Sequence, residues 1–141
     1  MTGKPAASSH AAMLYAWVCT GAVLGGGARY LASLLILPLS GFPLATLFVN
    51  ITGSFIIGFY ATLTGPGGRW FARVEHRQFV MTGFCGGYTT FSSFSLETVR
   101  LLHAGMTKTA LLNIAISVVT WLVAVWLGYA AASRLNRLKG S

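Results

Sequence analysis

The chain has 141 residues, of which 55% are hydrophobic and 9% are charged, and its mean hydropathy is +0.68. This composition is too apolar for an ordinary soluble domain and is typical of a membrane protein. The formal charge of +8 does not indicate nucleic-acid binding, because no basic groove with interleaved aromatic residues accompanies it and basic residues flanking membrane spans account for it.

The N-terminal part of the chain predicts a tail followed by a membrane span. Residues 1–10 are polar and unpatterned, which predicts a disordered tail, and residues 11–37 form the first predicted span. Because Lys4 precedes the apolar run, a cleaved signal peptide is the alternative interpretation of this segment. The run continues past Arg29 to residue 37, which favours a span.

The second predicted span is bounded by proline and glycine on both sides. A short turn is predicted at residues 38–43, and the span follows at residues 44–63. The sequence Gly65-Pro-Gly-Gly68 ends this span, and residues 69–77 form a basic, partly amphipathic connector.

Two further spans complete the predicted fold. The third covers residues 79–102, Gly105 predicts a tight turn, and the fourth span covers residues 110–132. Each span has roughly the ~20 residues that a bilayer requires. The sequence therefore predicts an all-α membrane protein with one four-helix transmembrane domain at residues 11–133 and a basic C-terminal tail at residues 134–141.

The distribution of lysine and arginine favours one orientation in the membrane. With four spans both termini lie on the same side, and most basic residues of tails and connectors fall there, which favours termini inside. Those residues are Lys4, Arg69, Arg73, Arg77, Arg134, Arg137 and Lys139. The opposite side would hold Lys108, with Arg100 near the end of the third span.

The most informative segment is residues 83–95, Gly-Phe-Cys-Gly-Gly-Tyr-Thr-Thr-Phe-Ser-Ser-Phe-Ser, inside the third predicted span. Its glycines and hydroxyl side chains predict a helix broken in mid-membrane, which lipid tolerates only where the break is buried or lines a polar path. Gly86 and Gly87 are expected to allow unusual backbone angles there. Phe91 and Phe94 share a helix face after the break, and ordinary packing is the alternative for them. Hydroxyls beside paired rings predict a site for a small ion.

Polar side chains recur at helical spacing in the second and fourth predicted spans. Each set forms a stripe that serves either as helix–helix contact or as the lining of a path. The residues are Thr46, Asn50 and Ser54, and Asn113, Ser117 and Thr120. Amide and hydroxyl groups donate hydrogen bonds, and aromatic ring edges are electropositive. A path lined in this way suits an anion.

Ionisable residues within spans are costly and usually face a bundle interior or water. Arg29 is expected either to attract anions into a vestibule or to anchor near a lipid headgroup. Glu97 is expected to pair with a cation, to hydrogen-bond a neighbouring helix or to take part in proton coupling. Cys19 and Cys85 are interpreted as small buried apolar residues, because no Cys or His pairing indicates a metal site. With no nucleotide-binding loop and no Ser/His/Asp set, the sequence does not indicate an enzyme.

Three segments of the chain resemble the Fluc fluoride channels of microorganisms, a family also called CrcB. They are Gly25-Gly-Gly-Ala-Arg29-Tyr30, Asn50-Ile-Thr-Gly-Ser-Phe-Ile-Ile-Gly58 and the third-span motif from Gly83 to Glu97. Leu111-Leu-Asn113 resembles the start of the fourth span of that family. The similarity covers nearly the whole chain outside the two tails.

The resemblance implies passive, selective fluoride export across the bacterial inner membrane by an antiparallel, dual-topology homodimer with two pores. By motif position it assigns the pore to Phe91, Phe94, Asn50, Ser92, Ser93 and Asn113. It further implies a structural Na⁺ at the dimer centre, held by the backbone carbonyls of Gly86 and Thr89. The resemblance therefore implies two opposite orientations in the membrane, whereas the count of basic residues favours a single one.

Two other classes of protein are consistent with a short chain of four spans. A small multidrug exporter requires a carboxylate in its first span, and the first span here contains none. A membrane subunit without transport activity would explain the spans but not the segment of hydroxyls and phenylalanines.

Overall fold

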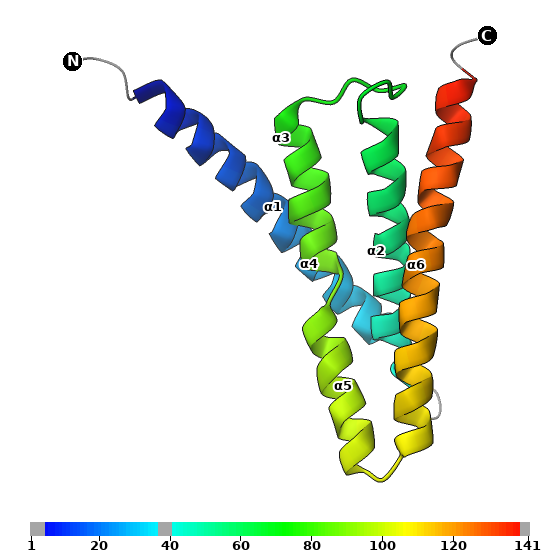
Figure 1. Cartoon of the computed structure of the whole chain (residues 1–141). Helices are drawn as coiled ribbons and strands as arrows, with labels where there is room; N and C mark the ends of the chain where they lie inside the picture. The colour runs from blue at the N-terminus through cyan, green and yellow to red at the C-terminus, as the bar shows by residue number, and fades with distance from the viewer. Residues whose placement is uncertain (1–4, 37–40, 139–141) are drawn as a thin grey trace.

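The computed structural model describes residues 5–36 and 41–138, with side chains from residue 9 onward, and these ranges contain helices and no strand (Figure 1). Three helices are long and apolar enough to cross a membrane, at Ser9–Leu35, Leu44–Leu63 and Thr107–Arg137. The prediction of an all-α membrane protein is therefore confirmed. The elements are α1 (Pro5–Leu35), α2 (Leu44–Leu63), α3 (Val74–Arg77), η1 (Gln78–Cys85), α4 (Gly86–Tyr88), α5 (Phe91–His103) and α6 (Thr107–Arg137).

The helix ends agree closely with the sequence in some places and differ in others. Helix α2 has the bounds predicted for the second span, whereas α1 begins at Pro5, inside the predicted tail. Helix α6 extends the fourth predicted span at both ends, as far as Arg137. The predicted turn at residues 38–43 lies partly outside the described residues. Gly105 has a φ of 74°, as its predicted turn requires.

Glycines bring the helices into two closely packed groups. In the first group α2 lies against α6, where a Cβ on Gly58 would collide with the Val125 carbonyl oxygen and one on Gly128 with that of Phe55. In the second group α1 lies against η1 and α4, and a Cβ on Gly25 would lie 2.8 Å from the Tyr88 nitrogen. Only glycine permits backbones to approach this closely in a membrane bundle.

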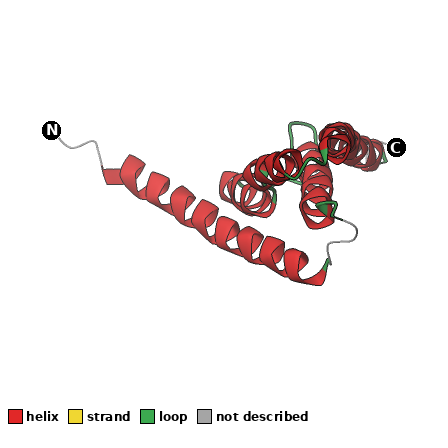
Figure 2. Cartoon of the chain, turned by 90° about the horizontal axis from the view of Figure 1, so that it is seen from below, coloured by secondary structure: helices red, strands yellow, loops and turns green. Residues whose placement is uncertain are grey.

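Helix α1 inclines away from the other helices, and its first half projects from the bundle (Figures 1 and 2). Many of its large apolar side chains are exposed, including Tyr15, Val23, Leu31 and Leu35. An apolar surface of this size requires lipid or another protein to cover it.

The start of α1, the loop between α2 and α3, and the end of α6 lie at the same end of the molecule (Figure 1). Asn136 of α6 ties the loop to this end, because its Oδ1 accepts a hydrogen bond from the Arg69 backbone N–H at 2.8 Å and its Nδ2 donates to the Thr62 carbonyl at 3.0 Å. Arg77 donates to the carbonyl and hydroxyl of Thr64 at the same end. The basic residues of the loop and of the last turn of α6 therefore gather on one side.

The helical segments that precede and follow Thr89 and Thr90 are separate. Helices α3 and α4 flank the π-helix η1, after which Thr89 and Thr90 have extended backbone angles, with ψ of 159° and 116°, before α5 begins at Phe91. One expectation for this segment is wrong: Gly86 has ordinary helical angles, φ −64° and ψ −36°. The departure from helix occurs at the two threonines and not at the glycines.

Candidate functional site

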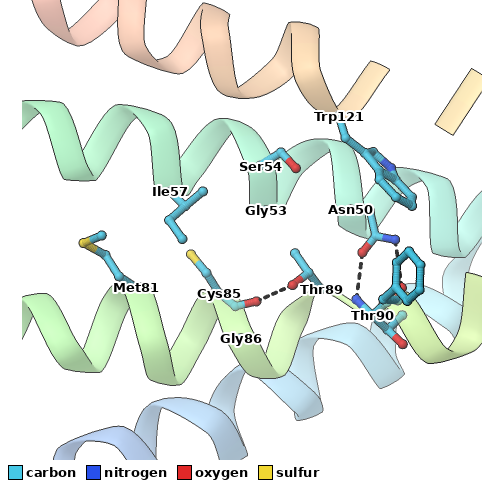
Figure 3. A pocket seen from close by; sticks show the side chains of 11 residues that line it. Asn50, Gly53, Ser54, Ile57, Met81, Cys85, Gly86, Thr89, Thr90 and Trp121 are labelled. Carbon is cyan, nitrogen blue, oxygen red and sulfur yellow. Dashed lines mark hydrogen bonds between the residues drawn. The ribbon is translucent and has the colours of Figure 1, made fainter. Parts of the chain in front are cut away.

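Asn50, in the middle of α2, binds the backbone of Thr90. Its Nδ2 donates to the Thr90 carbonyl at 2.9 Å, and its Oδ1 accepts from the Thr90 N–H at 2.7 Å (Figure 3). The side-chain amide therefore pairs with both backbone groups of an extended residue, as a neighbouring strand would. Asn50 is only 5% exposed. A buried backbone N–H or C=O without a hydrogen bond would raise the free energy of the folded protein, so this pairing stabilises the extended segment.

At the break, two backbone N–H groups donate to side chains and not to the carbonyls of the preceding turn. In a continuous helix the Thr90 N–H would donate to the Gly86 carbonyl, and the Ser93 N–H to the Thr89 carbonyl. Instead Thr90 donates to Asn50, and Ser93 donates to the Thr90 hydroxyl at 3.1 Å. The carbonyls of Gly86 and Thr89 thus lose their helical donors, while the Thr90 side chain caps the start of α5.

Hydroxyl groups cluster at the start of α5. The Thr90 hydroxyl lies 3.0 Å from the Ser93 Oγ, to which it donates, and 3.3 Å from the Ser92 Oγ. The structure therefore brings together the serines that the sequence assigns to the site, and adds Thr90 as their common partner.

A pocket of about 300 Å³ lies between α2, the η1–α4 segment and α6, beside the break (Figure 3). Its lining includes amide and hydroxyl groups but no carboxylate and no basic side chain. The lining residues are Asn50, Gly53, Ser54, Ile57, Met81, Cys85, Gly86, Thr89, Thr90, Phe91 and Trp121. Gly53 lets the Thr89 side chain reach α2, because a Cβ there would collide with the Thr89 methyl group. Such a lining offers hydrogen-bond donors and apolar surface, and it carries no charged side chain.

The two phenylalanines lie in different surroundings. Phe91 is 71% exposed and lines the pocket, whereas Phe94 is 7% exposed and packs edge-on to the Trp121 indole, with ring centroids 5.0 Å apart. The two phenyl rings are neighbours, with centroids 5.6 Å apart. They therefore form one aromatic surface that runs from the interior of the bundle to its outside.

Both predicted polar stripes face the interior, with one correction. Asn113 donates to the Thr98 hydroxyl at 2.9 Å, and Ser117 lies 3.4 Å from the Asn113 Oδ1. The Thr120 hydroxyl instead donates to the Ile116 carbonyl of its own helix at 2.6 Å. Trp121, four residues after Ser117, continues the stripe of α6 toward the pocket. The sequence did not indicate this residue as part of the site, because a tryptophan in an apolar helix usually serves in packing.

Arg29 and Glu97 line a second pocket of about 300 Å³ between α1, α2 and α5. The Glu97 Oε1 accepts a hydrogen bond from the Thr46 hydroxyl of α2 at 2.7 Å, which confirms the interpretation that Glu97 bonds a neighbouring helix. Ser93 and Thr90 line this pocket too. The two pockets therefore meet at the start of α5, with charged side chains in one and none in the other.

The cysteines differ from each other. Cys85 is buried beside the first pocket, but Cys19 on α1 is exposed, so its interpretation as a buried residue is wrong for the chain as described. Helix α1 has one face on η1 and α4, and Cys19 lies on the uncovered side. No group of three or more His, Cys, Asp or Glu side chains suited to a metal occurs in residues 5–36 and 41–138.

The fold and the site define a multi-pass membrane protein with an uncharged pocket, lined by amide, hydroxyl and apolar groups, beside the extended residues Thr89 and Thr90. The family model described as CrcB-like protein, Camphor Resistance (CrcB), matches residues 16–129. The chain belongs to this family.

Proteins named fluoride-specific ion channels are similar to the chain over nearly all of its length. Fluoride-specific ion channel FluC 1 of Bradyrhizobium diazoefficiens is 69% identical over 130 residues, which cover 92% of each chain. Fluoride-specific ion channel FluC 1 of Rhodopseudomonas palustris is 61% identical over 92% of this chain and 94% of its own. The FluC protein of Methylocella silvestris is 47% identical over 92% of this chain and 100% of its own.

Proposed function

We propose that the protein is a fluoride channel that lets fluoride leave the cell passively, and that it is not an enzyme. Relatives of 69% and 61% identity bear the name fluoride-specific ion channel. The observation that carries the proposal is the pocket at the break, which presents amide, hydroxyl and aromatic groups without a carboxylate. Such donors complement a small anion.

The working unit in this proposal is an antiparallel homodimer with two pores. Among the described residues, three helices are each long enough to cross a membrane, and α3 to α5 together make the fourth crossing, broken at Thr89 and Thr90. The exposed Phe91 and the exposed apolar side of α1 support a partner subunit at these surfaces. Basic residues at one end favour a single orientation, so the second copy inserts against that preference.

Within each pore, the residues act as successive hydrogen-bond donors. Asn50 uses one N–H of its amide to hold Thr90, which leaves the second for the anion. Ser92 and Ser93 provide hydroxyls at the start of α5, and Asn113 continues the path along α6. The edges of Phe91 and Phe94 complete the path.

The two charged residues of the second pocket have separate roles in this proposal. Arg29 attracts anions at the mouth of the pore, and Glu97 holds α5 to α2 through its hydrogen bond with Thr46.

A structural Na⁺ fits the donor set at the break. The carbonyls of Gly86 and Thr89 lose their helical donors to Asn50 and to the Thr90 hydroxyl, and neutral carbonyl oxygens are suitable ligands for a hard cation. The ion would hold two antiparallel breaks together without a charged side chain, and it would not move with fluoride.

The purified protein in liposomes should release fluoride rapidly and chloride at a far lower rate, as measured by ion-selective electrodes after an imposed potassium diffusion potential. Liposomes without protein provide the background. Equal rates for the two anions would contradict selectivity, and the absence of any flux would contradict the channel.

Removal of sodium should weaken the dimer. If two subunits share one Na⁺, exchange of sodium for N-methylglucamine should shift the protein toward monomer in detergent, and sodium should restore the dimer. Cross-linking or mass photometry measures the change, and potassium at equal ionic strength is the control. A dimer that persists equally in all three media would contradict the structural ion.

A further inference from the structure

Trp121 carries a buried polar group that the contacts described above leave unused. Its indole nitrogen Nε1 is shielded from solvent and has no hydrogen-bond partner among the described residues. Unpaired buried N–H groups are rare in native proteins, since each carries the cost of lost hydration, and an ordered water or ion commonly satisfies such a group. A hydrogen-bond acceptor for Trp121 would therefore come from outside the described residues.

The chemistry of the indole limits what this partner is. The Trp N–H donates and cannot accept, so its partner must be an acceptor. Trp121 lines the pocket beside the break together with Asn50 and Ser54, and no carboxylate lines that pocket (Figure 3). The Asn50 Oδ1, an obvious acceptor there, already receives the Thr90 N–H.

The position of the ring is well defined by its neighbours. Trp121 lies on the face of α6 that carries Asn113 and Ser117, and its indole packs edge-on to Phe94 with an interplanar angle of 75°. This contact and the backbone of α6 hold the ring beside the pocket.

We infer that the Trp121 indole N–H is an anion donor of the fluoride path, in the pocket that Asn50 and Ser54 also line and in contact with Phe94. The inference rests on the proposed fluoride channel and adds to it a donor on α6. An indole donor in an apolar pocket gives a small, strongly accepting anion one hydrogen bond that does not depend on a titratable group.

Indole NMR tests binding directly. In the ¹⁵N-tryptophan protein reconstituted in nanodiscs, the Nε1–H signal that Trp121→Phe removes should move downfield on titration with sodium fluoride. It should stay in place with sodium chloride, and the signals of Trp17, Trp70 and Trp126 should not move with either salt. A Trp121 signal that does not respond to fluoride would overturn the inference, because the indole N–H would then not bind the anion.

Flux provides the functional readout. Trp121→Phe should lower fluoride release by about tenfold or more, the factor that follows from loss of a hydrogen bond to a charged group. Trp126→Phe is the matched control, since Trp126 lies on the same helix, is 62% exposed and has no part in the pocket; its flux should equal that of the parent.

A second variant separates the N–H from the shape of the ring. Substitution of 3-benzothienylalanine at position 121 replaces N–H by sulfur and keeps the bicycle, and it should lower flux as Trp121→Phe does. Flux equal to that of the parent would overturn the role of Trp121 alone. A parent that conducts no fluoride would overturn the channel and this inference together.

Discussion

Asn50→Asp should lower fluoride flux by about a hundredfold or more. The carboxylate keeps the acceptor for the Thr90 N–H but removes the donor that holds the Thr90 carbonyl. It also places a negative charge beside the anion path, and two like charges ~4 Å apart repel by ~4 kcal/mol at an effective dielectric constant of about 20. Liposome flux measures the effect, and size-exclusion chromatography checks that the variant remains folded.

Asn136→Asp is the matched control for this prediction. Asn136 makes the same pair of hydrogen bonds as Asn50, one accepted from a backbone N–H and one donated to a carbonyl, but at the end of α6 far along the chain from the pocket. A carboxylate there lies near Arg134 and Arg137 and should leave flux unchanged. Equal flux from both variants and the parent would mean that Asn50 contributes neither structure nor charge selectivity to the path.

Gly25→Ala should strongly destabilise the folded protein, whereas Gly27→Ala should not. A methyl group at Gly25 collides with the Phe84 carbonyl oxygen and lies 2.8 Å from the Tyr88 nitrogen, and backbone atoms cannot move aside as a flexible side chain can. Overpacking of this kind costs about 1–3 kcal/mol. Gly27 meets nothing within 4 Å, so alanine there gains helix propensity without a collision.

Thermal unfolding followed by circular dichroism compares the two variants. The unfolding midpoint of Gly25→Ala should fall by about 5 °C or more, and that of Gly27→Ala should stay level or rise. Because the two positions lie in one run of three glycines, composition and depth in the membrane are matched. A reversed order of the two midpoints would contradict the close packing of α1 on α4.

The parts of the site that follow from helical spacing could be predicted. Thr46, Asn50 and Ser54 share a face of α2 because they recur every four residues, and that face meets Thr90 and Glu97 as a polar stripe should. The bounds of α2 were equally predictable, since proline precedes the apolar run and glycines follow it.

Other parts depend on contacts between distant residues, which spacing does not reveal. The pairing of Asn50 with Thr90 joins residues 40 positions apart, and it satisfies both backbone groups of Thr90 in the extended conformation while Gly86 remains helical. The attribution of the break to glycine was wrong for that reason. Trp121 was missed because a tryptophan in an apolar helix is usually packing, and its unpaired N–H is visible only once its neighbours are known.

The length of α1 has a mechanical consequence. Its membrane-capable part has 27 residues against 20 for α2, so it is about 40 Å long where α2 is about 30 Å long. In a hydrocarbon layer ~30 Å thick, a helix of this length is accommodated by a tilt of about 40° if α2 stands upright. Figure 1 shows α1 inclined to α2. Gly21 and Gly25 couple α1 to the backbone of η1 and α4. A change in bilayer thickness that altered the tilt of α1 would therefore act, through these glycine contacts, on the backbone that immediately precedes Thr89.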